Sequence, residues 1–226
     1  MRFEDIVALC KAAGLASRGA FHPEPDDGVP PLTDGTPAAT LLLLGFVGSA
    51  TWSVFAASPE ASDYQPHPLD RWSRRVIDAL ATTVGALALY PFGGSPYLPF
   101  QRWARRAEPV YPSPLGLLIH PDWGLWHSYR GALALRERLD LPPRDVRPSP
   151  CDSCAAKPCL SGCPVGAFTA RGYDTAACVA HTGTAAGRDC IDEGCRARRA
   201  CPIGTAHRLL SKQAAHHMRA FRASFR

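Results

Sequence analysis

The stretch CDSCAAKPCLSGCPVGAF, residues 151–168, places four cysteines within thirteen positions and follows the last one with proline. A second group, CIDEGCRARRACP at residues 190–202, contains three more cysteines, and Cys178 stands between the two groups. Clustered cysteines of this kind serve disulfide frameworks, structural zinc sites or iron–sulfur clusters. The spacing of the cysteines and the character of the rest of the chain distinguish between these uses.

The spacing favours iron–sulfur clusters. Both groups end in Cys-Pro, and in bacterial ferredoxins the run C-x2-C-x2-C-x3-C-P supplies three cysteines to one [4Fe–4S] cluster and the fourth to another. Structural zinc usually takes two pairs at C-x2–4-C spacing, to which the Cys159-x3-Cys163 and Cys195-x5-Cys201 arms do not reduce. Eight clustered cysteines make two four-cysteine clusters with none left over. The x4 spacings, where a ferredoxin has x2, leave the pairing of ligands open.

The remainder of the chain fits a folded protein in a reducing compartment. Of its 226 residues 46% are hydrophobic and 20% are charged, as in globular domains. The start MRFEDIVALC lacks the features of a signal peptide, so we expect a cytoplasmic protein without disulfides. Residues 40–57 carry no charge, but glycines interrupt them and they are only just long enough to cross a membrane. We therefore expect a buried strand at residues 41–47, no membrane span, and a buried, inert thiol at Cys10.

Charge and cysteine content divide the chain near residue 150. Residues 1–150 hold 14 Lys and Arg against 15 Asp and Glu, a net charge of −1, whereas residues 151–226 hold 11 against 5, a net charge of +6. The proline-rich stretch 141–150 between them suits neither helix nor strand. The sequence predicts an α/β (α+β) domain at residues 1–145 and a small ferredoxin-like domain at residues 146–226 that ends in a basic helix.

Apolar periodicity predicts the elements of the first domain. Helices are expected at residues 3–15, 69–84 and 100–107, and the loop at residues 22–37 is rich in proline and glycine. Strands are expected at residues 41–47, 86–92, 115–120 and 127–135, the last two pairing around the turn PDWG. In the C-terminal basic helix, Ile203, Leu210 and Phe221 are expected to face inward.

The segment SPLGLLIHPDWGLWHSYRGALAL, residues 113–135, resembles a segment of epoxyqueuosine reductases that reads G-W-x-G-K-x3-L-I-x-P-x2-G-S-W-x2-L-G-E. It is also similar to the H-P-x2-G-x-W-x3-R-G segment of CblC-type cobalamin-processing proteins. The cysteine region resembles the ferredoxin-like tail of the reductases, including the isolated cysteine. The matching positions of the CblC-type segment are His120, Pro121, Gly124, Trp126, Arg130 and Gly131.

This resemblance implies a flavin-reductase-like or CblC-like domain that binds a base-off corrinoid (cobalamin) in place of flavin and receives electrons from two [4Fe–4S] clusters. It implies one cluster on Cys151, Cys154, Cys159 and Cys201, and a second on Cys163, Cys178, Cys190 and Cys195. It implies a cofactor site at His120, Gly124, Trp126, Arg130 and Gly131. Four tryptophans, which we expect to line a cavity, are Trp72, Trp103, Trp123 and Trp126.

The chain departs from the reductases at the acid thought to donate a proton. Their D-x-A-P segment corresponds here to Pro96-Tyr97-Leu98-Pro99, which contains no carboxylate. Tyr90 or Tyr97 could donate a proton instead, but the sequence assigns no catalytic residue.

Three functions follow from these patterns. We favour an iron–sulfur redox protein, an oxidoreductase, that passes electrons to a corrinoid for cobalamin-dependent reduction or cobalamin processing. The alternative is a ferredoxin-type electron-transfer protein without a corrinoid, and the least favoured is reduction of epoxyqueuosine in tRNA, which only the basic tail supports independently. The expected partners are a small-molecule cofactor or substrate and an electron-donor protein. Arginines at positions 196, 198 and 199 lie beside predicted ligands, where they either hold the charge of a cluster or form a solvated basic face.

Overall fold

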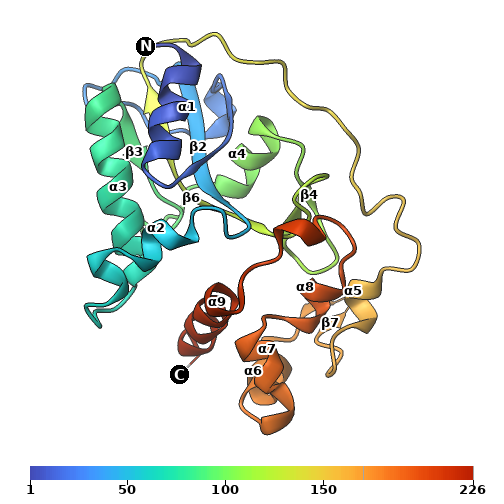
Figure 1. Cartoon of the computed structure of the whole chain (residues 1–226). Helices are drawn as coiled ribbons and strands as arrows, with labels where there is room; N and C mark the ends of the chain where they lie inside the picture. The colour runs from blue at the N-terminus through green and yellow to red at the C-terminus, as the bar shows by residue number, and fades with distance from the viewer. Residues whose placement is uncertain (170, 226) are drawn as a thin grey trace. The chain divides into compact units, whose positions relative to one another are not determined.

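A computed structural model describes residues 1–169 and 171–225 and divides the chain into two compact units (Figure 1). Unit 1 comprises Met1–Pro109 and His127–Val146, and unit 2 comprises Val110–Trp126 and Arg147–Arg226. The segment 110–126, which we expected in the first domain, thus groups with the cysteine-rich region. The functional division at residues 145/146 stays a prediction.

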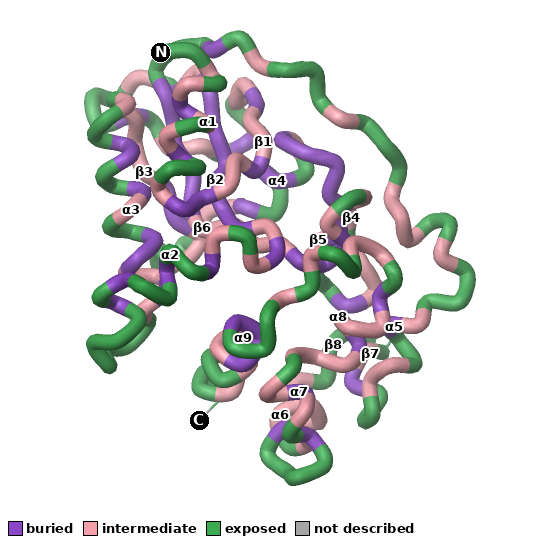
Figure 2. Tube along the Cα trace, viewed as in Figure 1, coloured by how far each residue is buried: buried purple, intermediate pink, exposed green. Residues whose placement is uncertain are grey.

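Unit 1 contains a four-stranded antiparallel sheet, whose strands lie in the order β1 (Ala16–Phe21), β2 (Thr40–Val47), β6 (His127–Leu135) and β3 (Leu87–Leu89). The apolar run of β2 forms a strand because its leucines are covered on both faces of the sheet, and Figure 2 shows this strand buried along most of its length. This confirms the strand predicted at residues 41–47.

Helices complete the core of unit 1. The longest, α3 (Pro68–Val84), begins with proline in its first turn and ends at Gly85, which adopts the left-handed conformation (φ +68°) that favours glycine. Its buried face carries Trp72 and Leu80 into the same cluster as Leu42 of β2. The other helices of this unit are α1 (Phe3–Ala12), α2 (Trp52–Ala56) and α4 (Phe100–Ala107), with short 3-10 turns at Pro25–Asp27 and Pro59–Ala61. This mixture of helix and strand confirms the predicted α/β class.

The strand predicted at residues 115–120, paired with 127–135, is wrong. Only β5 (Leu118–Ile119) is extended there, and it pairs with β4 (Tyr111–Pro112). Gly116 adopts φ +72° and its N–H donates to the Ser113 carbonyl, so the apolar run folds back on itself as a tight hairpin. Strand β6 pairs instead with β2 and β3.

Unit 2 consists of short elements joined by turns. The predicted C-terminal helix is present as α9 (Ser211–Ala223), but its buried residues are Gln213, Ala214 and Ala215. Leu210, expected inward, precedes the helix and is 62% exposed. No helix among the described residues is long and apolar enough to cross a membrane. The remaining elements are α5 (Pro158–Ser161), β7 (Phe168–Thr169), β8 (Gly172–Tyr173), α6 (Thr175–Thr182), α7 (Arg188–Asp192), α8 (Arg196–Ala200) and α9 (Ser211–Ala223), with 3-10 turns at Ala185–Gly187 and Thr205–His207.

Candidate functional site

Four cysteines of unit 2 gather around one hollow. Cys151, Cys154, Cys159 and Cys201 line it together with Ile119, Ile203 and several prolines. Burial raises the pKa of the Cys151 thiol, and the charges of the other three sulfurs raise it further. Such mutual influence requires the four sulfur atoms to lie close together. These are the four cysteines that the resemblance assigns to one cluster.

The other four cysteines form a second group. Burial raises the pKa of the Cys178 thiol, which also feels the charges of Cys163 and Cys190. The pKa of Cys195 is raised by burial and then by Cys190 and Cys178. The Tyr173 hydroxyl donates a hydrogen bond to the Cys178 sulfur. The structure therefore brings the eight clustered cysteines together as two sets of four.

Backbone N–H groups point at several of these sulfurs. The N–H of Ala167 donates to Cys163 Sγ at 3.3 Å. The Cys195 sulfur accepts from the N–H groups of Ala197 and Arg198, and Cys201 accepts from Ile203. Donors of this kind stabilise thiolate charge and are one of the means by which proteins set iron–sulfur potentials.

The geometry differs from that of a preformed single-ion site. Among residues 1–169 and 171–225, no group of three or more Cys, His, Asp or Glu side chains could hold one metal ion as placed. A four-iron cluster does not need that convergence, because each of its thiolates binds a different iron atom.

The turn that follows β5 packs against the second Cys-Pro loop. Gly124 adopts φ +56°, and a Cβ added there would lie 2.1 Å from the Ile203 carbonyl oxygen. Gly204 adopts φ +68°, and its added Cβ would lie 2.3 Å from the Trp123 carbonyl carbon. The backbones of these two glycine turns are therefore in contact. On one side the contact is made by Ile203 and Gly204, which follow Cys201 by two and three residues. Leu115, Ile119 and Leu125 form an apolar cluster with Cys159, Ala197 and Cys201.

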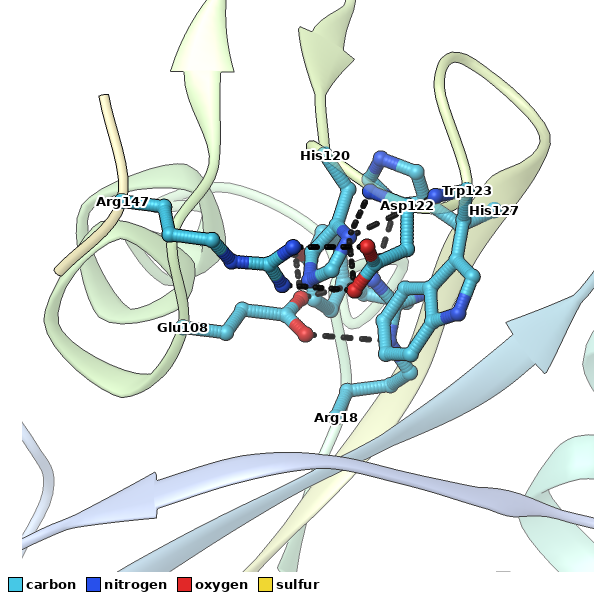
Figure 3. Close-up of polar contacts among 8 residues, drawn as sticks. Arg18, Glu108, His120, Asp122, Trp123, His127 and Arg147 are labelled. Carbon is cyan, nitrogen blue, oxygen red and sulfur yellow. Dashed lines mark hydrogen bonds and ion pairs between the residues drawn. The ribbon is translucent and has the colours of Figure 1, made fainter. Parts of the chain in front are cut away.

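Three of the five residues predicted to bind a cofactor belong to this packing in unit 2. His120 and Gly124 exchange backbone hydrogen bonds of 2.9 Å across the turn. The His120 ring stacks on Trp123 at 3.8 Å, and its Nδ1 accepts from the Asp122 N–H at 3.0 Å (Figure 3). Asp122 in turn accepts two hydrogen bonds from Arg147, at 2.7 and 2.6 Å. Trp126 is 3% exposed.

The other two residues lie on β6 in unit 1. Arg130 forms an ion pair with Asp70 and donates to the Ser73 hydroxyl at 3.0 Å. A Cβ added to Gly131 would lie 2.6 Å from the Ile77 side chain. All five predicted residues therefore contact other parts of the protein, and their role in binding a corrinoid stays a prediction.

Two of the four tryptophans that we expected to line a cavity lie in the core of unit 1. Trp72 and Trp103 are almost completely buried in unit 1, 1% and 0% exposed, and the Trp103 indole N–H donates to the Asp27 carbonyl at 2.8 Å. They are packing residues because the α/β core of this unit needs large apolar side chains to fill it.

The two candidate proton donors, Tyr90 and Tyr97, differ in their exposure to solvent. The Tyr90 hydroxyl donates to Asp78, and burial raises the pKa of this phenol. Tyr97 is 70% exposed, in the segment that lacks the acid of the reductases.

Sequence reasoning missed a buried polar cluster in unit 1 (Figure 3). Arg18 is fully buried, and its guanidinium donates to Glu108 at 2.7 Å and to the Phe46 carbonyl at 2.9 Å. It also lies 3.0 Å from His127 Nδ1, and the Tyr129 hydroxyl donates to Glu108. Burial raises the pKa of Glu108, against the opposing charge of Arg18. Up to 109 positions separate these residues, and no local pattern marks them.

Comparison with known proteins identifies the fold of the chain. No family model and no curated protein matches it. An epoxyqueuosine reductase from Bacillus subtilis, with its catalytic loop swung out of the active site, is similar with a TM-score of 0.50 at 14% identity, over 92% of this chain and 66% of that one. The chain thus has an epoxyqueuosine-reductase-like α/β fold and spans just under two thirds of that protein's length.

Two further epoxyqueuosine reductases align at 14% identity. One, solved with an epoxyqueuosine-modified tRNA-Tyr stem loop, has a TM-score of 0.48 over 93% of this chain and 69% of that one. The other, from Streptococcus thermophilus, has a TM-score of 0.45 over 90% of this chain and 66% of that one. The resemblance to CblC-type proteins has no counterpart in these comparisons and stays a prediction.

Proposed function

We propose that this chain is an iron–sulfur redox protein that carries two [4Fe–4S] clusters and passes single electrons to an acceptor bound by unit 1. One cluster would be held by Cys151, Cys154, Cys159 and Cys201, and the other by Cys163, Cys178, Cys190 and Cys195. The partition of the eight cysteines into these two sets of four carries the proposal. The N–H groups directed at Cys163, Cys195 and Cys201 support it, because they suit thiolate ligands.

The charge of the cysteine-rich part agrees with this proposal. A [4Fe–4S]²⁺ core with four thiolates carries a net charge of about −2, so two clusters contribute about −4. Residues 151–226 have a net charge of +6 from their Lys, Arg, Asp and Glu side chains. The loaded region would therefore stay close to neutral, which limits the electrostatic cost of holding two anionic groups near each other.

The acceptor that we propose is a base-off corrinoid, which would make the protein an oxidoreductase for cobalamin-dependent reduction or cobalamin processing. The epoxyqueuosine-reductase-like fold and the resemblance at residues 113–135 support this acceptor. A corrinoid supplies a cobalt centre that accepts electrons one at a time. The alternative is a ferredoxin-type electron carrier whose unit 1 docks a partner, and in either case an electron-donor protein is needed.

Reduction of epoxyqueuosine in tRNA is the least favoured function. The segment 96–99 contains no carboxylate, and Tyr90, the buried phenol nearby in sequence, donates its hydrogen bond to Asp78. The basic C-terminal region is the feature that could contact phosphates.

Protein purified without oxygen is expected to be brown and to contain about eight iron and eight sulfide per chain, as two four-iron clusters require. Iron and acid-labile sulfide assays with a parallel zinc determination measure this directly. Protein that contains zinc and little iron would reject the iron–sulfur proposal.

Adding hydroxocobalamin or cob(II)alamin to the iron-loaded protein is expected to give the absorption spectrum of a base-off corrinoid. After dithionite reduction of the clusters, the cobalt is expected to move toward Co(I). Apoprotein serves as the control that separates binding from reduction. If fully iron-loaded protein leaves the corrinoid spectrum unchanged at excess ligand, the ferredoxin-type function replaces the corrinoid-dependent one.

A further inference from the structure

The three arginines of α8 have different surroundings. Arg196 and Arg199 both bond to the carboxylate of Asp189, at 2.7 and 2.6 Å, and their side chains are 40% and 31% exposed. Arg198 turns inward within unit 2, where its guanidinium lies 4.7 Å from the centre of the Trp126 ring and donates to the Leu125 carbonyl at 2.5 Å. No ion pair with a carboxylate is formed by Arg198 among the described residues.

The backbone of Arg198 bonds to one cysteine from each of the two sets of four. Its N–H donates to the Cys195 sulfur, and its carbonyl accepts the N–H of Cys201 at 3.3 Å. A guanidinium keeps its proton at neutral pH, so Arg198 brings a positive charge next to a predicted ligand of the second cluster.

Two buried N–H donors here have no acceptor. The Nε atom of Arg198 and the indole Nε1 of Trp126 are both inaccessible and lack a hydrogen-bond partner in the described part of the chain. A buried donor without an acceptor is costly, so its presence calls for a group that accepts from it. The sulfur atoms of an iron–sulfur cluster are acceptors of the required kind.

We propose that Arg198 sets the reduction potential of the cluster that Cys195 ligates, holding it higher than the thiolates alone would allow. This inference rests on the proposed function. One-electron reduction takes the cluster with its four thiolates from a charge of about −2 to about −3. A fixed positive charge removed from water favours the more negative state, because the low local dielectric screens it weakly. The effect of Arg196 and Arg199 is expected to be smaller, because their side chains are 40% and 31% exposed and share the carboxylate of Asp189.

The test is a potentiometric titration of anaerobic, iron-loaded protein with dithionite as the electron source, followed by electron paramagnetic resonance. Arg198→Gln is expected to lower the midpoint potential of one cluster, identified as the signal that Cys178→Ala removes. The matched control Arg196→Gln makes the same change of charge on the same helix and is expected to lower that potential much less, because the Arg196 side chain is 40% exposed and paired with Asp189. Arg198→Lys keeps the charge and is expected to restore most of the potential.

Each outcome separates the two proposals. Wild-type protein without iron rejects the proposed function, whatever Arg198 does. Wild-type protein with eight iron, together with an unchanged potential in iron-loaded Arg198→Gln, rejects only the role of Arg198. If Arg198→Gln loses the cluster, Arg198→Lys decides: retained iron with a potential near that of the wild type supports the role of charge. Iron lost equally from Arg198→Lys shows that Arg198 acts through packing and overturns the inference.

Discussion

Gly124→Ala is expected to lose about half of the iron, because the proposed cluster on Cys151, Cys154, Cys159 and Cys201 would depend on a loop that this glycine allows into place. The added Cβ would lie 2.1 Å from the Ile203 carbonyl oxygen, a distance that backbone atoms do not tolerate. The turn must then move away from the loop that begins at Cys201, a predicted ligand of that cluster. The remaining iron should give the spectrum of the second cluster, as seen with Cys201→Ala. Iron assay and electron paramagnetic resonance of the reduced protein measure both effects.

Gly116→Ala is a matched control for this substitution. Gly116 lies in the same segment and also has a positive φ, +72°, but nothing lies within 4 Å of its added Cβ. Both alanines meet the same backbone strain, about 1 kcal/mol, and only Gly124→Ala adds a clash. We expect Gly116→Ala to keep about eight iron per chain. A Gly124→Ala protein with full iron and unchanged spectra would show that the turn does not support the cluster.

The packing of the Gly124 turn could not be predicted from the sequence. The motif at residues 120–131 resembles a cofactor-binding segment, and this resemblance implies a corrinoid site that includes His120 and Gly124. The contacts that Gly124 makes are with Ile203, far along the chain, and no local pattern predicts a backbone-to-backbone approach at that separation. The cysteines behave differently because their residue type, spacing and the following proline carry the chemistry locally. The spacing alone therefore predicts iron–sulfur clusters, whereas the division of the cysteines into two sets of four comes from the resemblance to the tail of the reductases.

The fold was predictable where a single apolar face dominates. Strand β2 and helices α3 and α4 lie at the predicted positions. An unbroken apolar run is typical of a buried strand, and apolar residues spaced at 3.6 residues are typical of a helix with one buried face. The run at residues 115–120 is also largely apolar, but Gly116, with its positive φ, turns it into a hairpin. Arg18 could not be anticipated, because its burial depends on Glu108, His127 and Tyr129 meeting it from distant parts of the chain.

Glu108→Gln is expected to destabilise unit 1 by about 3–5 kcal/mol, since it leaves the Arg18 charge buried without its carboxylate. Arg18 is 0% exposed and Glu108 is 6% exposed, so water cannot replace the lost partner. Chemical denaturation followed by tryptophan fluorescence reports this, because Trp72 and Trp103 are buried in the same unit. The fluorescence midpoint should fall while the iron content of the folded protein stays the same.

Glu60→Gln is the control that separates the effect of burying the arginine from the effect of losing its carboxylate partner. Glu60 also bonds to an arginine, at 2.5 Å, but the side chain of Arg75 is 55% exposed. Because solvent rehydrates Arg75 once its partner is neutral, we expect a cost of about 1 kcal/mol or less.

The double variant Arg18→Met with Glu108→Leu removes both charges of the buried pair. It should recover most of the stability lost in Glu108→Gln, since replacing a buried ion pair by apolar side chains often changes the free energy of unfolding little. Equal losses for Glu108→Gln and Glu60→Gln, or a double variant less stable than Glu108→Gln alone, would mean that the buried pair stabilises unit 1 through hydrogen bonds and shape rather than through charge.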